Sequence, residues 1–299
     1  MYYKKISDLN FKKKLTFIVV DYNTFEFIEK LYNSIKKFIT KIDYRIIIVT
    51  NLETTSWEKL KKLSDEKEEI EILIQNKNTG FGVSNNLGLS KTNSEYICFI
   101  NPDIEFIENM DMFFEDGFLE LNKNENIGII SPNLLNTDNT QQIFWGKLPG
   151  SLEKQKYYKS KYTNINYIEY PWIIGAFYLV KKMNIPDGIA FDPNIFMYAE
   201  DLDLCLRYKK QNLKILVNTK YNVIHYGGSS LKEILEEDKF FKKYFLERKS
   251  LFYVLNKHFS KSYVKYYFFT RAIINFILGK YLKNQRRYRI WKIYKEILK

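Results

Sequence analysis

Short apolar runs alternate with helical patterns over the first hundred residues of this chain, and this alternation constrains the fold more than any other feature. Each run has the length of one strand, and the stretches between the runs repeat apolar residues at helical spacing. Strands that are apolar on both faces are typical of a parallel sheet covered by helices on each side. We therefore predict a Rossmann-like α/β half with strands at Leu15–Val20, Arg45–Val49, Ile70–Ile74 and Glu95–Ile100, and helices at Phe25–Phe38 and Trp57–Lys67.

The pattern is less regular beyond residue 100. A helix is expected near Asn109–Leu121, followed by strands at Ile127–Ile130, Trp172–Val180 and Leu213–Val217. In open α/β sheets ligands bind beyond the carboxyl ends of the strands. The residues that directly follow each strand are therefore the first candidates for a site.

Positive charge is concentrated at the C-terminal end of the chain. The formal net charge is +12, but residues 239–299 hold 17 basic and 2 acidic residues, which leaves the rest of the chain slightly acidic. Aromatic residues are also frequent in this segment. Because its apolar residues fall at near-helical spacing, we expect basic, amphipathic helices. Two groups carry the pattern, one at Phe241, Phe245, Phe252, Leu255 and Phe259 and one at Ile274, Ile277, Leu278 and Tyr281.

Several partners fit such a segment. An anionic membrane surface would attract its basic residues and take up its apolar faces. The body of the protein or a second subunit would cover the apolar faces instead. Single-stranded nucleic acid also binds basic, aromatic surfaces, so a nucleic-acid-binding protein is the rival from another class. That reading leaves the acidic motifs of the body unexplained, and we expect no nucleic-acid partner.

No stretch of the sequence has the length and apolarity of a membrane span. The longest uncharged run, Asn78–Ser90, is rich in Asn, Gly and Ser. The run Leu15–Val20 is shorter than the core of a secretion signal. Cys98 and Cys205 lie in apolar patterns without metal-site spacing, so both are expected to be reduced packing residues. We expect a cytoplasmic protein.

Two acidic motifs are candidates for chemistry. INPDIEF places Asp103 just after an apolar run, where a carboxylate can ligate a divalent cation that also binds phosphates; a simple turn is the alternative. YAEDLDLCLR begins a helix with Glu200, Asp201 and Asp203. Acids are favoured at a helix N-terminus, and Asp203 can pair with Arg207. Three carboxylates within four residues nevertheless exceed what one cap needs, and such a cluster suits a general base.

Two further segments carry weaker signals. The glycines of NKNTGFGVSNNLGLS would let backbone amides approach a ligand closely, but their spacing matches neither a dinucleotide fingerprint nor a Walker loop. His225, in HYGGSS, follows a predicted strand and is either a ligand or an ordinary strand-end histidine.

Six ordered motifs resemble glycosyltransferase family 2, in particular its bacterial rhamnosyltransferase-like branch: VVDYN, NTGFGVSNNLG, FINPD, WIIGAFYLV, FMYAEDLDLCLR and HYGGSS. The resemblance runs from about Leu15 to Leu231. It implies a GT-A fold, in which a Rossmann-like, nucleotide-binding mixed sheet is flanked by helices and carries an acceptor-binding half. We accordingly expect a transferase domain at residues 1–231 and a basic, aromatic-rich helical extension at 232–299.

The resemblance also implies roles for individual residues. Asp201 would be the general base, and Asp103 would bind the metal, Mg²⁺ or Mn²⁺, with His225 near the metal or the diphosphate. Trp172 and Glu200 are candidates on the acceptor side, although core burial is at least as good a reading of Trp172. The donor-binding residues would be Tyr22, Asn51, Gly80, Phe81, Asn101 and Asp103.

The activity implied is an inverting, metal-dependent glycosyl transfer from a nucleotide-diphosphate sugar to a glycan or lipid-linked saccharide in bacterial cell-surface polysaccharide synthesis. L-Rhamnose from dTDP-rhamnose is the first expectation, and a UDP-hexose donor is the alternative. One departure is Thr50 in IVTNLET, where the family commonly has an acid, so contacts to the nucleobase must differ locally. Peripheral attachment at the inner face of the cytoplasmic membrane is expected through the extension, and a homodimer is a further candidate.

Overall fold

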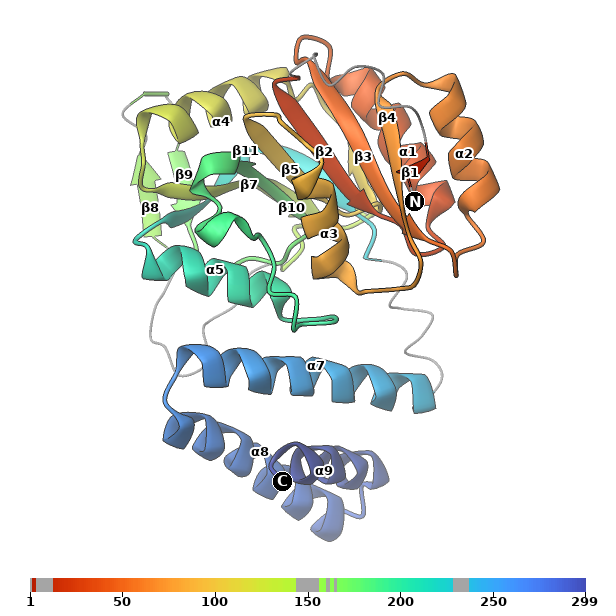
Figure 1. The fold of residues 1–299 in the computed structure, drawn as a ribbon. Coiled ribbons are helices and arrows are strands. Elements are labelled where there is room, and N and C mark those ends of the chain that lie inside the picture. The colour runs from red at the N-terminus through yellow and green to blue at the C-terminus, as the bar shows by residue number, and fades with distance from the viewer. Residues whose placement is uncertain (1, 4–12, 144–155, 160–161, 164–165, 228–236) are drawn as a thin grey trace.

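The computed structural model describes residues 2–3, 13–143, 156–159, 162–163, 166–227 and 237–299, and every structural statement below concerns these residues (Figure 1). One mixed sheet forms the centre of the molecule, with strand order β1-β4-β3-β2-β5-β10-β7-β11-β9-β8 and with β6 paired to β11. The strands are β1 (Tyr2–Tyr3), β2 (Leu15–Val20), β3 (Tyr44–Asn51), β4 (Ile70–Gln75), β5 (Tyr96–Ile100), β6 (Ile104–Phe106), β7 (Ile127–Leu135), β8 (Lys156–Lys159), β9 (Asn166–Glu169), β10 (Phe177–Lys181) and β11 (Lys214–His225).

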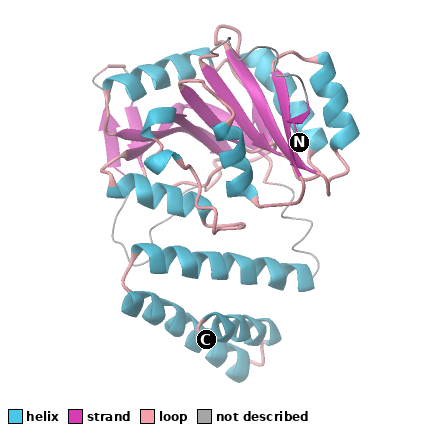
Figure 2. Ribbon diagram, in the orientation of Figure 1, coloured by secondary structure: helices cyan, strands magenta, loops and turns pink. Residues whose placement is uncertain are grey.

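The helices cover both faces of this sheet, as Figure 2 shows. Helix α4 packs on one face through Phe114, whose ring lies 5.7 Å from that of Phe17. Helix α3 lies on the other face, where Gly88 contacts Ile18. The helices are α1 (Phe25–Phe38), α2 (Trp57–Glu66), α3 (Phe81–Ser90), α4 (Asp111–Lys123), α5 (Glu200–Lys210), α7 (Glu237–His258), α8 (Lys261–Tyr281) and α9 (Gln285–Ile297).

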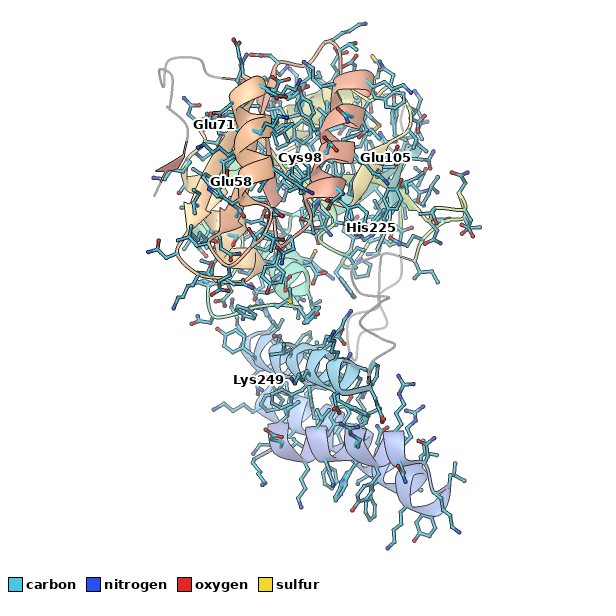
Figure 3. The ribbon with its side chains drawn as sticks, turned by 90° about the vertical axis from the view of Figure 1, so that its right-hand side faces the viewer. Glu58, Glu71, Cys98, Glu105, His225 and Lys249 are labelled. Atoms are coloured by element: carbon cyan, nitrogen blue, oxygen red, sulfur yellow. The ribbon has the colours of Figure 1, made fainter. Side chains whose placement is uncertain are left out.

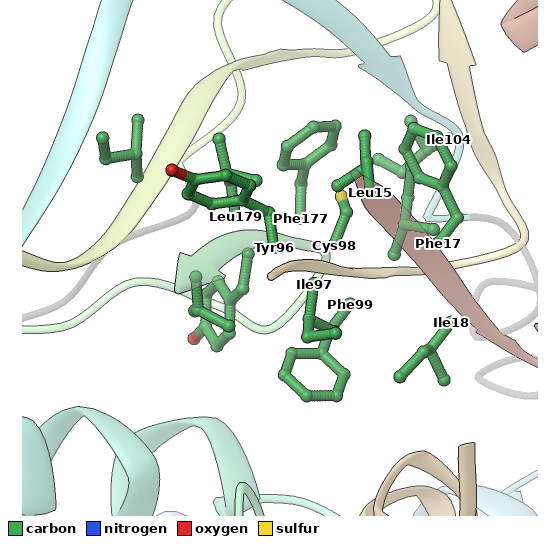
Figure 4. Close-up of a cluster of buried hydrophobic side chains, with 14 of the residues drawn as sticks. Leu15, Phe17, Ile18, Tyr96, Ile97, Cys98, Phe99, Ile104, Phe177 and Leu179 are labelled. Carbon is green, nitrogen blue, oxygen red and sulfur yellow. The ribbon is translucent and has the colours of Figure 1, made fainter. Parts of the chain in front are cut away.

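The predicted parallel half is confirmed. Strands β2, β3, β4 and β5 run parallel, and their residues are buried on both faces. Figure 4 shows the alternation, with Phe17 and Cys98 on one side of the sheet and Ile18 and Phe99 on the other. Both cysteines are free and buried, as predicted. This arrangement places the carboxyl ends of the parallel strands along one edge.

The strand predicted at Trp172–Val180 is wrong in its first half, since β10 begins only at Phe177. The preceding residues bond to other groups: the amide of Gly175 donates to Asp201, and the carbonyl of Ile173 accepts from the hydroxyl of Tyr178. Strand β11 is longer than predicted, because it continues through an irregular stretch to His225.

The C-terminal segment forms α7, α8 and α9, which pack around a core of their own. Helix α7 lies alongside α5, and the other two lie on the side of α7 away from the sheet (Figure 1). The predicted boundary at residues 231 and 232 lies outside the described residues. Among the described helices, none has the length and apolarity to cross a membrane.

The apolar group predicted on the second helix of the extension lies on an exposed face of α8, with Ile274, Ile277 and Tyr281 exposed. Val264, Phe268 and Ala272 form the buried face of this helix. The helix is apolar on both sides, so spacing alone could not decide which side faces the core.

Candidate active site

Asp103 and His225 come together because β6 pairs with β11. The antiparallel register sets His225 opposite Ile104, and the amide of Tyr226 donates to the carbonyl of Asp103 at 2.9 Å. As a result, Nε2 of His225 lies 3.4 Å from Oδ1 of Asp103, and both side chains are mostly buried. Figure 3 shows His225 at the lower edge of the sheet domain, towards the extension. Two motifs separated by more than a hundred residues therefore contribute to one point of the sheet edge.

The hydrogen bonds of His225 favour a metal-binding form of its ring. Nδ1 lies 2.7 Å from Oε1 of Gln142, and the amide nitrogen of Gln142 donates to Asn136, which fixes the orientation of Gln142. If Nδ1 donates to this oxygen of Gln142, Nε2 is the nitrogen that could ligate a cation placed between His225 and Asp103.

A carboxylate oxygen and an imidazole nitrogen at this spacing fit one Mg²⁺ or Mn²⁺ ion. Such ions are commonly held by one or two protein ligands, with substrate phosphates and water completing the shell. No larger cluster of His, Cys, Asp or Glu with metal-site geometry occurs among the residues that the structure describes.

The other strand ends carry the predicted donor-binding residues. Tyr22 follows β2 and is 53% exposed, so its ring is free to stack on a ligand. Asn51 ends β3 and is buried, with its side-chain oxygen accepting from the amide of Glu53. Asn101 follows β5, and its amide donates to the carbonyl of Ala176.

Asp21 is one of the strand-end residues singled out in the sequence, but no role was predicted for it. The hydroxyl of Thr50 donates to Oδ2 of Asp21 at 2.8 Å, and the amide and hydroxyl of Thr24 both donate to Oδ1. A buried carboxylate thus stands beside Thr50, on the neighbouring strand. The signal was present in VVDYN, since Asp21 directly follows an apolar strand.

Gly80 and Phe81 lie at the start of α3, against the segment that leads to α5. Gly80 has φ of 88°, and an added Cβ would come within 1.9 Å of the carbonyl oxygen of Phe196, so only glycine fits. Phe81 packs on Phe191, with ring centroids 5.6 Å apart. The close approach predicted for Gly80 is therefore made to the protein's own backbone.

Glu200 and Asp201 begin α5 as two neighbouring carboxyl groups. Burial raises the pKa of Asp201 to about 6. Hydrogen bonds from the amides of Leu202 at 2.7 Å and Gly175 at 3.3 Å lower it, but burial has the larger effect. Burial and, second, the charge of Asp201 raise the pKa of Glu200 to about 8. One group of the pair is thus ionised near neutral pH while the other holds a proton, and this separation is typical of acid and base sites.

The comparisons with known proteins identify the family of this chain. The family model for glycosyl transferase family 2 matches residues 16–185. The chain belongs to glycosyltransferase family 2. The curated relatives include the low-salt glycan biosynthesis hexosyltransferase Agl10 of Haloferax volcanii, 23% identical over 87% of this chain and 81% of that protein. They also include the rhamnosyltransferase WbbL of Escherichia coli K12, 25% identical over 50% of this chain and 61% of that protein.

Solved structures support the GT-A fold of this family 2 glycosyltransferase. A crystal structure of GalNAc-T7 with UDP, GalNAc and Mn²⁺ matches with a TM-score of 0.56 and 13% identity, over 72% of this chain and 43% of that one. A crystal structure of residues 1–349 of TarS from S. aureus matches with a TM-score of 0.53 and 14% identity, over 91% of this chain and 73% of that one. The predicted fold and family are confirmed.

Asp203 has a different environment from the other two acids of this glycosyltransferase. It has no exposed surface, and it binds Arg207 through Oδ2 as predicted. Lys257 and His258, which the sequence analysis did not connect to it, both lie 2.8 Å from Oδ1. Burial alone would raise the pKa of Asp203, but the hydrogen bonds from His258 and Lys257 outweigh it and lower the pKa to about 2.

Trp172 is half-buried at the interface between the sheet domain and the extension. It packs on the cluster of Ile195, Leu202, Leu206 and Val254. Its Nε1 atom is buried without a hydrogen-bond partner among the described residues, and the same holds for Oε2 of Glu200. These two acceptor-side candidates therefore each offer a polar atom with unused bonding capacity.

Proposed function

We propose that this enzyme transfers a sugar from a nucleotide-diphosphate donor to a glycan or lipid-linked saccharide acceptor, with inversion, in cell-surface polysaccharide synthesis. The observation that carries the proposal is the carboxylate of Asp201, which lies half-buried at the start of α5, accepts hydrogen bonds from the amides of Leu202 and Gly175, and has a raised pKa of about 6. A base with that pKa is mostly ionised at neutral pH yet basic enough to accept the proton of a sugar hydroxyl. Family membership supports a nucleotide-sugar donor and a glycan acceptor.

In this mechanism Asp201 accepts the acceptor's proton as the hydroxyl oxygen attacks the anomeric carbon, and the bond to the diphosphate breaks in the same displacement. The amide of Gly175 holds one oxygen of Asp201, so the carboxylate keeps a fixed direction. The partnerless atoms of Trp172 and Glu200 would hydrogen-bond the acceptor's hydroxyl groups. Protonated Glu200 is a donor in that arrangement.

Asp103 and His225 would hold a divalent cation, and such a cation supplies charge that stabilises a departing diphosphate. Tyr22 and Asn51, at the ends of neighbouring parallel strands, are the proposed contacts to the nucleoside. We propose dTDP-L-rhamnose as the first donor to test, supported by the similarity to WbbL, and UDP-hexoses as the second, supported by the similarity to Agl10.

The experiment is a thermal-shift screen of dTDP, UDP, dTDP-L-rhamnose and UDP-hexoses, each with and without Mg²⁺ or Mn²⁺. A ligand at about 100 times its dissociation constant should stabilise the folded protein by about 2.7 kcal/mol. A metal-dependent shift followed by release of the nucleoside diphosphate supports the proposal. Release of pyrophosphate or sugar phosphate would instead indicate nucleotidyl transfer or hydrolysis.

We further propose that residues 232–299 attach the transferase domain, residues 1–231, to an anionic membrane on its cytoplasmic side. An exposed apolar stripe along α8 supports this proposal: Tyr266, Phe269, Ile273, Ile277 and Tyr281 are between 41% and 72% exposed. These residues recur every three or four positions and so share one face of the helix. The segment around them is strongly basic, which complements anionic headgroups.

Sedimentation with vesicles of phosphatidylglycerol tests the attachment, with phosphatidylcholine vesicles as the comparison. The triple variant Phe269→Ser, Ile273→Ser and Ile277→Ser should bind phosphatidylglycerol vesicles at least tenfold more weakly. Met183→Ser, which changes an exposed apolar residue on the sheet domain, is the matched control. If the wild type binds neither vesicle but forms a dimer that the triple variant loses, the stripe is a subunit contact instead.

A further inference from the structure

The turn that leads into α5 has a strained backbone. Tyr198 and Ala199 have φ values of 67° and 63°, in the left-handed region, and neither is a glycine. Such conformations persist in L-residues only where the surrounding structure imposes them. Glu200 and Asp201 follow directly, so the direction of both carboxyl groups depends on what holds this turn.

Helix α7 of the extension contacts the turn on the N-terminal side of Asp201. The hydroxyl of Ser250 donates to the carbonyl of Met197 at 2.7 Å. The ammonium group of Lys243 lies over the ring of Tyr198, 5.7 Å from its centroid. One polar bond and one cation–π contact therefore fix the strained turn from outside the sheet domain.

The same helix contacts α5 on the C-terminal side of Asp201. Nζ of Lys257 lies 2.8 Å from Oδ1 of Asp203 and 2.6 Å from Oδ2 of Asp192, so one ammonium group links α5 to the segment before it. Nε2 of His258 lies 2.8 Å from the same oxygen of Asp203. Asp203 has no exposed surface and the His258 side chain is 2% exposed, so the bond between them is shielded from water and salt, whereas Lys257 is 31% exposed.

Apolar packing fills the space between the two sets of polar contacts. Val254 is fully buried against Ile195, Leu202 and Leu206. Leu202 is the residue next to Asp201, so α7 also restrains the backbone that bears the base. Helix α7 thus contacts the turn before Asp201, the neighbouring residue Leu202, and Asp203 after it.

We propose that α7 positions the catalytic base, with Ser250, Lys257 and His258 as positioning residues for Asp201. The inference rests on the proposed role of Asp201 as the base. The donor-side residues Tyr22 and Asp103 follow strands that none of these contacts restrains. Loss of an α7 contact should therefore lower turnover and leave donor affinity nearly unchanged.

The test compares Lys257→Met with Lys249→Met in the full-length protein. Lys249 is exposed on the same helix and is labelled in Figure 3, so its variant changes the charge of α7 equally. For Lys257→Met we expect at least tenfold faster amide hydrogen exchange of residues 197–203 and at least tenfold lower kcat for release of dTDP from dTDP-L-rhamnose. We expect KM for the donor to stay within twofold, and Lys249→Met to match the wild type.

Two milder variants separate positioning from stability. Lys257→Arg keeps a cation between Asp192 and Asp203 and should recover kcat to within threefold of the wild type. Ser250→Ala removes one hydroxyl and should lower kcat about threefold in a fully folded protein. If these variants lower only the melting temperature, and their kcat equals that of the wild type at temperatures where they are fully folded, the positioning role is overturned.

Hydrogen exchange needs no substrate, so it distinguishes the two proposals. Unchanged exchange of residues 197–203 in folded Lys257→Met overturns positioning by α7, whatever the activity. In the opposite case, the wild type releases no nucleoside diphosphate from any nucleotide sugar, but Lys257→Met shows the faster exchange. The proposed function then fails, and the restraint of residues 197–203 by α7 stands.

Discussion

The two acidic sites of this enzyme are held in different ways. Asp103 lies between β5 and β6, and sheet pairing with β11 sets its backbone and brings His225 beside it. Asp201 follows a strained turn that has no strand pairing, and a helix some fifty residues further along the chain contacts both sides of it. Hydrogen-bonded strands fix the first site, whereas side chains of the extension fix the second. Substitutions in the extension should therefore affect the position of Asp201, the proposed base, more than they affect the proposed donor site.

The largest effect is expected for Asp201→Asn. Removing a general base typically costs ~10²- to 10⁴-fold in rate, so kcat should fall at least about a hundredfold while donor affinity stays nearly intact. Turnover is measured by nucleoside diphosphate release, and affinity by calorimetry. Asp187→Asn, at an exposed residue, is the control. Equal losses of donor affinity in Asp201→Asn and Asp103→Ala would contradict the separate roles of the two sites.

Asp103→Ala should have the complementary effect. Without its carboxylate, the stabilisation by nucleotide and metal together, about 2.7 kcal/mol at 100 times the dissociation constant, should largely disappear. The measurement is the metal-dependent thermal shift. Glu125→Ala removes an exposed carboxylate and should keep the full shift. A variant at Asp103 that still shows the whole metal-dependent shift would place the cation elsewhere.

Asp203→Asn tests the link between the sheet domain and the extension through stability. The pKa of Asp203 is lowered from 3.8 to about 2, so its ionised form stabilises the fold by about 2 kcal/mol above pH 4. This contribution is lost as the pH falls from about 4 through 2. Urea unfolding at pH 7 should show the loss in Asp203→Asn. An unfolding free energy equal to that of Asp187→Asn would show that these bonds add nothing.

The last prediction concerns the pH dependence of the wild type, whose effect is small near neutral pH. Because burial raises the pKa of Asp201 to about 6, protonation removes the base at a higher pH than for an ordinary aspartate. We expect kcat to fall about tenfold for each pH unit below 6. A profile that stays flat down to pH 4 would mean that Asp201 is not the base whose ionisation limits turnover.

Much of the parallel half could be predicted from the sequence. Apolar strands and short helices have local patterns, and residues after parallel strands must share one edge, so the position of Tyr22, Asn51 and Asp103 could be predicted, while their donor-binding roles stay a prediction. The bond between Asp21 and Thr50 could not be predicted, because Thr50 lies on the neighbouring strand. Which apolar side of α8 faces the core could not be predicted either, because a helix with two similar sides has no preferred side by itself.

The sequence by itself determined the alternating strands and helices of the parallel half, the identity of the acidic motifs and the basic character of the C-terminal segment, since each of these depends on residues that are close in the chain. Only the tertiary structure decided which acids have a raised pKa and which is an ion-pair partner. Glu200, Asp201 and Asp203 lie within four residues, yet burial raises the pKa of the first two, and Lys257 and His258 lower that of the third. Those partners lie 54 and 55 residues beyond Asp203, and a pKa depends on neighbours in space, not on neighbours in the chain.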